Sequence, residues 1–243
     1  MARALNACFA VLFIIYFVNM YQCKVLTHLS RAEYTPKKDR NRLFKNTLAD
    51  PSNGVRDHAI LRLLYGMPVR PIELIRYRTY EFVDQQGIVK PNENLVVRKE
   101  ISFSGIERPM PLLDPVLIDG LQDWVNYRLK NKWGVTQTGY INLDTPFFMV
   151  NKNNGFTVHK TIQDGKERFS TESINRVIRK RFTLNGIEGN VENGLRTWTL
   201  DRHHEGRDAR AIWQLRDDLR FDTVQNAIRN DPIRLGALVE KVF

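Results

Sequence analysis

The chain has 243 residues, of which 42% are hydrophobic, so its composition predicts a folded globular protein. Lysine and arginine outnumber aspartate and glutamate by 37 to 27, which gives a formal net charge of +10. A basic excess of this size favours an anionic partner, either nucleic acid or an anionic membrane surface. The two cysteines, Cys8 and Cys23, both lie near the start of the chain, which excludes a disulfide framework and a cysteine-based zinc site and suits a reducing compartment.

Residues 1–31 are predicted to form a hydrophobic N-terminal segment and a basic connector. Between Arg3 and Lys24, twenty residues carry no charge, and as a helix they would reach about 30 Å, the thickness of a bilayer core. Three interpretations fit this segment. Residues 4–23 could contact a membrane as an anchor whose basic flank keeps the rest of the chain in the cytoplasm. They could be a signal peptide, although no small-residue cleavage site follows, or a buried helix or a start-site artefact.

Residues 32–243 are predicted to form one domain of α+β class, mainly helical. Thr35 and Pro36 indicate a capped helix start. Apolar residues at helical spacing then predict a helix that breaks between Gly66 and Pro71, where a second helix begins with Glu73 in its first turn. This arrangement places Arg70 at a corner between two helices.

A small antiparallel β-hairpin follows. The stretches from Val96 to Phe103 and from Arg108 to Leu113 contain strand-forming residues, and the sequence SGIE between them predicts a turn. Pro109 and Pro111 indicate an edge strand, because proline cannot donate a hydrogen bond to a neighbouring strand.

The rest of the domain is predicted to be largely helical. Asp114 caps an amphipathic helix, residues 145–150 form a short buried strand or extended piece, and residues 151–169 form a polar loop region. Residues 170–187 predict another amphipathic helix. Its apolar face contains Ile174, Val177, Ile178 and Phe182, and its polar face contains the candidate phosphate contacts Arg176, Arg179, Lys180 and Arg181.

Residues 32–243 resemble the tyrosine recombinases, the phage-integrase type of site-specific recombinase. LRLLYGMPVRPIEL is similar to the first arginine box of that family, and ERPMPL to the end of its β-hairpin. GLRTWTLDRHHEGRDARAIWQL resembles the second arginine box, and NDPIRLGALV resembles the tail that follows the nucleophile in some members. The resemblance implies the tyrosine-recombinase catalytic-domain fold and double-stranded DNA as the partner.

The chemistry of that family explains these residue types. A tyrosine hydroxyl attacks a DNA phosphate, while two arginines hold the non-bridging oxygens with planar, forked donors. The resemblance places the two arginines at Arg70 and Arg196, with Glu73 as the companion of the first. The alternative for both arginines is a buried structural salt bridge, for instance between Arg70 and Glu73.

Several family positions hold other residues here. Asn193 stands where a histidine is usual; an amide can donate a hydrogen bond to phosphate but cannot shuttle a proton. No lysine lies at residues 103–105, where the hairpin lysine is expected. Asp218 replaces a usual histidine or tryptophan, and an anion there would repel phosphate. The nucleophilic tyrosine is expected near Ala227, but the last tyrosine of the sequence is Tyr140.

The sequence therefore predicts a DNA-binding protein of the recombinase family, in a recombination, integration or mobile-element context, without strand-transfer activity of its own. Two alternatives stay open: an active recombinase that uses a partner's or an unrecognised nucleophile, and a decayed or membrane-tethered module without a DNA role. The predicted partners are DNA and either further copies of the chain or an active recombinase, in the cytoplasm, free or tethered. The candidate catalytic positions are Arg70, Arg196 and Asn193, and the candidate DNA-binding residues are Arg70, Arg196, Arg176 and Lys180.

Neither a cofactor nor a metal site is predicted. His203, His204 and Glu205 are adjacent on a predicted helix, where successive side chains diverge by about 100° and cannot easily hold one ion.

Overall fold

The computed structural model describes residues 34–163, 166–216, 218 and 220–242. The apolar segment and its predicted boundary at residue 31 lie outside this range. The helices are α2 (Lys37–Leu48), α3 (Gly54–Gly66), α4 (Pro71–Arg76), the 3-10 helix η1 (Thr79–Glu81), α5 (Pro115–Asn131), α6 (Glu172–Leu184), α7 (Asn193–His204), α8 (Ala209–Arg216), α9 (Phe221–Arg229) and α10 (Pro232–Val242). Within the described ranges, no helix has the length and apolarity needed to cross a bilayer.

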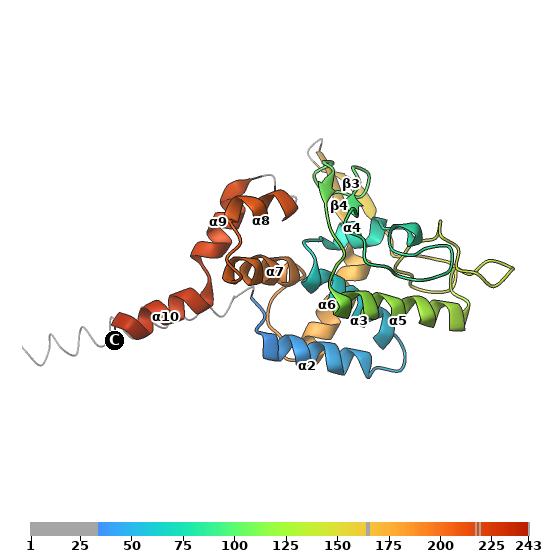
Figure 1. The fold of residues 1–243 in the computed structure, drawn as a ribbon, viewed down its shortest axis with the longest axis horizontal. Helices are drawn as coiled ribbons and strands as arrows, with labels where there is room; N and C mark the ends of the chain where they lie inside the picture. Colours follow the sequence, from blue (N-terminus) through green and yellow to red (C-terminus); the bar gives the residue numbers. More distant parts are fainter. Residues whose placement is uncertain (1–33, 164–165, 217, 219, 243) are drawn as a thin grey trace, which may run out of the picture. The chain divides into compact units, whose positions relative to one another are not determined.

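Helix α3 lies at the centre of the helical part and contacts α2, α5, α6 and α7 (Figure 1). Ten of its thirteen residues are buried, as expected for a helix covered by others on several sides. Helix α5 begins as predicted, because the Asp114 side chain accepts a hydrogen bond from the backbone nitrogen of Val116 at 2.9 Å. The predicted cap of α2 is wrong: the helix begins at Lys37, and the Thr35 hydroxyl instead lies 2.9 Å from the Tyr65 hydroxyl.

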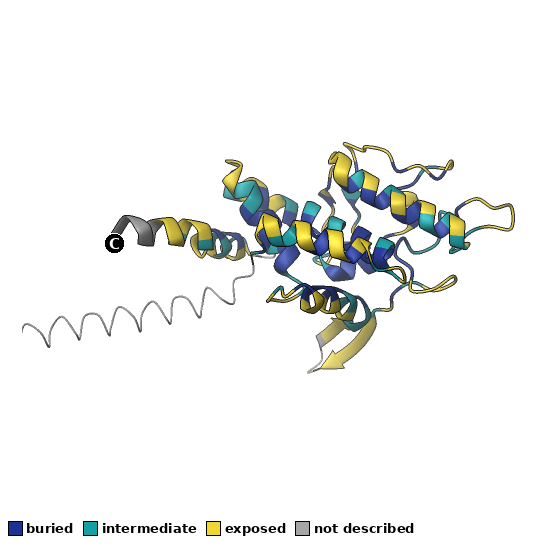
Figure 2. Ribbon diagram, turned by 90° about the horizontal axis from the view of Figure 1, so that it is seen from below, coloured by how far each residue is buried: buried dark blue, intermediate teal, exposed yellow. Residues whose placement is uncertain are grey.

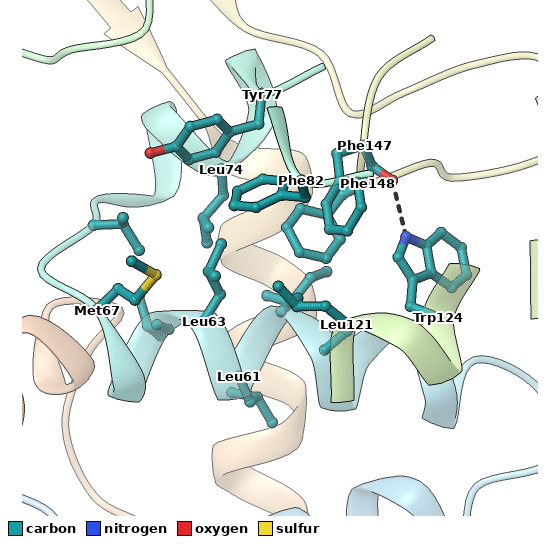
Figure 3. Close-up of a cluster of buried hydrophobic side chains, with 14 of the residues drawn as sticks. Leu61, Leu63, Met67, Leu74, Tyr77, Phe82, Leu121, Trp124, Phe147 and Phe148 are labelled. Carbon is teal, nitrogen blue, oxygen red and sulfur yellow. Dashed lines mark hydrogen bonds between the residues drawn. The ribbon is translucent and has the colours of Figure 1, made fainter. Parts of the chain in front are cut away.

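The main hydrophobic core joins α3 and α5 to an extended segment that contains Phe147 and Phe148 (Figure 3). The ring centroids of Phe82 and Phe147 are 4.7 Å apart, and Trp124 Nε1 donates to the backbone oxygen of Phe147 at 2.8 Å. This segment is the predicted extended piece, and isolated β-bridges at Pro146 and Met149 fix its ends.

The predicted hairpin is present but short. Strand β1 (Val96–Val97) pairs antiparallel with β2 (Arg108–Pro109), with Val97 opposite Arg108. The backbone between the two strands forms turns, so the extension of the first strand to Phe103 was wrong. With helices α2 to α10 and two small antiparallel sheets, the described chain is mainly helical and confirms the predicted α+β class.

The loop predicted for residues 151–169 is wrong in its second half. Strand β3 (His159–Gln163) pairs antiparallel with β4 (Lys166–Ser170), with Thr161 opposite Arg168. Every residue of β3 is exposed, which Figure 2 shows in yellow. The residues of this hairpin whose burial is described are all exposed, and its sequence lacks the alternation of apolar and polar residues that predicts a strand.

Helix α6 has the predicted apolar face, but one residue assigned to its polar face is buried. Arg181 is only 4% exposed. Its Nε lies 2.7 Å from Asp57 Oδ2, and its Nη1 lies 2.6 Å from Asp50 Oδ2. Arg181 therefore fastens α6 to the start of α3, whereas Arg176 and Lys180 are exposed as predicted.

Candidate functional site

Arg70 lies at the corner between α3 and α4, as the sequence predicts. It is the residue before Pro71, the first residue of α4, where a proline suits the helical backbone. Its backbone nitrogen donates to Glu73 Oε2 at 2.8 Å. The side chain of Arg70 therefore starts from a fixed backbone position.

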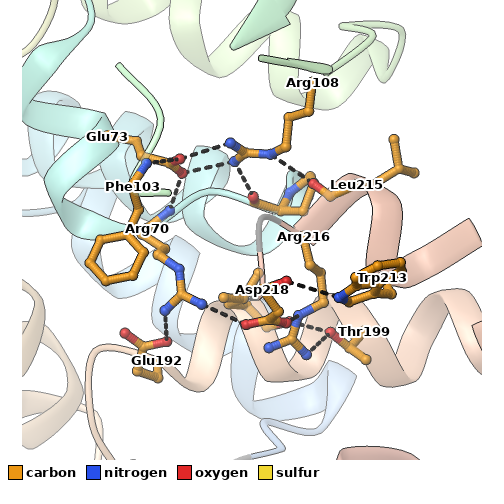
Figure 4. Close-up of polar contacts among 12 residues, drawn as sticks. Arg70, Glu73, Phe103, Arg108, Glu192, Thr199, Trp213, Leu215, Arg216 and Asp218 are labelled. Carbon is orange, nitrogen blue, oxygen red and sulfur yellow. Dashed lines mark hydrogen bonds and ion pairs between the residues drawn. The ribbon is translucent and has the colours of Figure 1, made fainter. Parts of the chain in front are cut away.

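Glu73 forms its salt bridge with Arg108 and not with the guanidinium of Arg70 (Figure 4). Both residues are buried, and Arg108 Nη1 and Nη2 lie 2.8 and 2.9 Å from the two carboxylate oxygens. Arg108 also donates to the backbone oxygens of Pro68 at 2.9 Å and Leu215 at 2.8 Å. Because Arg108 neutralises Glu73, the guanidinium of Arg70 is left to bind other anions, and the Arg70–Glu73 salt bridge considered above does not form.

The guanidinium of Arg70 points toward α7 and the connector between α8 and α9. Its Nη2 lies 2.6 Å from Asp218 Oδ1, and its Nη1 lies 3.3 Å from Glu192 Oε2. The ring of Phe103, from the turn between β1 and β2, lies under the guanidinium, with its centroid 4.8 Å away. The position where a hairpin lysine was expected is thus next to Arg70 but carries an aromatic ring.

Arg196 lies on the side of α7 that faces Asp218. Glu192, Arg196 and Thr199 are spaced four and three residues apart, so they follow one side of the helix. Arg70 contacts Glu192 at one end of this row, and Arg216 Nη1 donates to Thr199 Oγ1 at 2.6 Å at the other end.

The carboxylate of Asp218 links the arginines that surround it. One oxygen contacts Arg70, and the other lies 2.7 Å from Arg216 Nε. Burial lowers the pKa of Arg196, and the negative charge of Asp218 opposes that shift. The pKa of Arg216 is lowered as well, first by burial and then by the positive charges of Arg70 and Arg196, and the negative charge of Asp218 opposes this shift. Arg70, Arg196 and Arg216, the arginine cluster, therefore gather around one carboxylate.

Such an arrangement is suited to bind an anion. Guanidinium groups stay protonated in proteins, and those of the cluster are partly or fully removed from water, where attraction to an anion is stronger than at an exposed surface. The site contains three positive groups from three helical segments, and its forked donors match the oxygens of a phosphate or carboxylate.

Arg216 was not among the residues predicted from the sequence. It is 3% exposed and ends α8, next to the connector that contains Asp218. The only signal in the sequence is its place two residues before the acidic position, which does not distinguish it from the other arginines of this basic chain.

Asn193 is fully buried, and its amide binds the loop before α7. Its Nδ2 donates to the backbone oxygen of Glu188 at 3.0 Å, and its Oδ1 accepts from the backbone nitrogen of Asn190 at 3.0 Å. Gly189 has a φ of +125°, and a Cβ there would lie 2.1 Å from Asn193 Nδ2, so the loop requires glycine at this point. A contact between Asn193 and a phosphate stays a prediction.

The remaining candidate residues lie on α6, α7 and α9. Arg176 and Lys180 are exposed on α6, which packs against α4, the helix that follows Arg70. Ala227, near the position expected for the nucleophile, lies on α9 and is partly buried. Within the described part of the chain, no group of three or more histidine, cysteine, aspartate and glutamate side chains could hold a metal ion, and His204 Nε2 instead lies 2.6 Å from Asp231 Oδ2.

Comparisons with known proteins give a match at the level of structure. No family model matches the sequence, and no curated protein matches it. The structure is similar to that of XerA recombinase, with a TM-score of 0.57 and 20% identity over 86% of this chain and 62% of that chain. It is also similar to XerH site-specific recombinase, solved in a post-cleavage complex with its palindromic difH substrate, with a TM-score of 0.56 and 10% identity over 85% of this chain and 52% of that chain.

The chain thus spans less than two thirds of the length of either recombinase. At these identities the likeness shows the fold, and it confirms the fold that the two arginine boxes and the hairpin predicted. The described part of the chain has the fold of the tyrosine-recombinase catalytic domain.

Proposed function

We propose that this chain binds double-stranded DNA and holds a backbone phosphate with Arg70 and Arg196, without carrying out strand transfer by itself. The observation that supports this most is that the two arginines, 126 positions apart in the sequence, surround the same buried carboxylate. A place that binds one anion through several guanidinium groups has the charge and donor geometry that a phosphodiester requires. The XerH structure, which shares this fold, contains a DNA substrate.

The proposed lack of strand transfer follows from what the sequence places around the arginines. Strand transfer in the family needs a tyrosine oxygen to attack phosphorus while a 5′ oxygen leaves with a proton. No tyrosine follows Tyr140 in this sequence, and Phe103 and Asp218 stand where a proton donor and a phosphate contact are expected. The sequence thus keeps the positive groups for the phosphate and has no tyrosine at the position from which the family's nucleophile attacks.

The proposal extends to the surroundings of the site. Arg176 and Lys180 would contact further phosphates along the duplex, because they are exposed cations on a helix next to α4. The chain would act in the cytoplasm as an accessory or regulatory protein, together with further copies or with an active recombinase. Contact with a membrane through residues 4–23 remains a separate proposal, which cell fractionation would test.

A mobility-shift titration over a range of salt concentrations tests DNA binding. Affinity should fall steeply with salt, with a slope of about −0.9 for each phosphate contact. Arg70→Lys keeps the charge but loses the fork, and Arg196→Lys does the same on α7, so each variant should bind about tenfold more weakly. Arg78→Lys is the matched control, because Arg78 is an exposed arginine that follows the end of α4 and donates to the backbone oxygen of Asp144. Equal affinities for all four proteins would exclude a role for the two arginines.

A nicked suicide substrate tests the absence of strand transfer. Such a duplex traps any covalent link between protein and DNA, because the released fragment diffuses away. We expect no covalent product with this chain, at any DNA concentration that saturates binding. A covalent product that persists in denaturant would show that the chain has an unrecognised nucleophile.

A further inference from the structure

We propose that Asp218 is an internal ligand of the arginine cluster. In the free protein its carboxylate occupies the place of the DNA phosphate, and it must move out of the cluster when DNA binds. This inference rests on the proposed function, because it concerns the regulation of the same site.

The geometry of the carboxylate supports this role. One oxygen of Asp218 lies 2.6 Å from Arg70 Nη2, and the other lies 2.7 Å from Arg216 Nε. Two oxygens of one anion, each facing a guanidinium, reproduce the way in which arginines hold the two non-bridging oxygens of a phosphodiester. The side chain is only 4% exposed, so Asp218 fills the space between the guanidinium groups.

The charges around the carboxylate make Asp218 and a phosphate alternatives. Among the residues that the structure describes, three cations, Arg70, Arg196 and Arg216, lie close to two carboxylates, Asp218 and Glu192. If a phosphate entered while Asp218 stayed, the two anions would repel each other at close range, in a place where little water screens them. If Asp218 leaves, the cluster loses one negative charge, and the phosphate takes over its partners.

The location of Asp218 allows this exchange without the loss of a helix. It lies in the connector between Arg216, the last residue of α8, and Phe221, the first residue of α9. Its backbone oxygen accepts one hydrogen bond, from Trp213 Nε1 at 2.8 Å (Figure 4). Among the contacts of the described residues, removal of the carboxylate breaks its ion pairs with Arg70 and Arg216 and this hydrogen bond, so Trp213 reports on the change.

Asp218→Asn tests the inference, because the amide has the same shape and no charge. At fixed salt, the variant should bind duplex DNA about tenfold more tightly than the wild type, since DNA no longer has to displace a carboxylate. Asp222→Asn is the matched control: it changes the net charge equally, but Asp222 is exposed in the first turn of α9. The control should change affinity less than twofold.

The outcomes separate this inference from the proposed function. If the wild type binds DNA and Arg70→Lys weakens it, but Asp218→Asn binds no more tightly than Asp222→Asn, then Asp218 is not a competing ligand and the proposed function stands. If neither the wild type nor Asp218→Asn shows salt-dependent binding, both proposals are overturned.

A measurement on the wild-type sequence covers the case in which Asp218→Asn does not fold. The protein is labelled with 5-fluorotryptophan, and Trp213→Phe assigns the fluorine resonance of Trp213 among the four tryptophans. Saturating duplex DNA should shift this resonance, because the contact with the backbone oxygen of Asp218 is lost. A Trp213 resonance that stays in place while DNA is bound would overturn the inference.

Discussion

Arg108→Gln should strongly destabilise the fold, and the structure allows the size of the effect to be worked out. Arg108 is 4% exposed and Glu73 is fully buried, and four hydrogen bonds of Arg108 end on Glu73, Pro68 and Leu215. Glutamine is too short and too weak a donor to replace them. Among the described contacts, Glu73 would keep its hydrogen bonds from the backbone nitrogens of Arg70 and Phe103, neither of which carries a positive charge to the carboxylate.

A buried carboxylate that loses its cation costs about 3–5 kcal/mol. Arg179→Gln is the control, because Arg179 pairs with Glu172 at 2.7 Å, a distance like the 2.8 Å between Arg108 and Glu73. The side chains of the control pair are 52% and 46% exposed, however. Water screens such a pair, so its loss should cost roughly 0–1 kcal/mol.

Urea unfolding followed by circular dichroism measures both effects. With an m value of about 3 kcal/mol/M for a domain of this size, Arg108→Gln should lower the midpoint by roughly 1–2 M. Arg179→Gln should lower it by about 0.3 M or less. Equal shifts for the two variants would show that burial does not decide the strength of these pairs, and the reasoning would be refuted.

Gly194→Ala should lower the free energy of unfolding by at least about 2 kcal/mol, because a Cβ there would lie 2.6 Å from a backbone oxygen of α3. At Gly236 a Cβ would meet open space, so Gly236→Ala should be neutral or slightly stabilising in the same urea assay. Burial lowers the pKa of His58 to about 4, so the unfolded chain takes up a proton between about pH 6.5 and 4 that the folded chain does not, and stability should fall as the pH is lowered through that window. His58→Gln should remove this part of the pH dependence, and an unchanged profile of urea midpoints would contradict the assignment. Arg176→Ala combined with Lys180→Ala should weaken DNA binding and reduce its salt slope by about 2, and an unchanged slope would place DNA elsewhere.

The sequence predicted the parts of the fold that depend on local signals. Helical spacing of apolar residues located α3 and α6, and the capping residue located the start of α5. The corner at Arg70 followed from a glycine and a proline on either side of it. These signals act within a few residues of one another, so one sequence is enough to read them.

Contacts between distant residues were harder to predict. The sequence assigned Arg181 to a polar face, yet it is buried and paired with Asp50 and Asp57, which lie more than 100 positions earlier in the chain. In the candidate site, the sequence indicated Arg70, Arg196 and the unusual acid at Asp218, but it did not show that Asp218 binds the arginines or that Arg216 joins them. The packing of the helices decides which cation pairs with which anion. A single sequence with many charged residues allows many possible ion pairs and does not show which of them form.

The β3–β4 hairpin has a consequence for how this molecule can change over time. Because none of the side chains of β3 is buried, substitutions there leave the hydrophobic core untouched. The guanidinium of Arg76 lies over the ring of Phe169, 5.5 Å from its centroid, and this contact places the base of the hairpin near the helix that follows Arg70. New residues can accumulate on this projection at little cost in stability, so it is where closely related chains can come to differ in what they recognise.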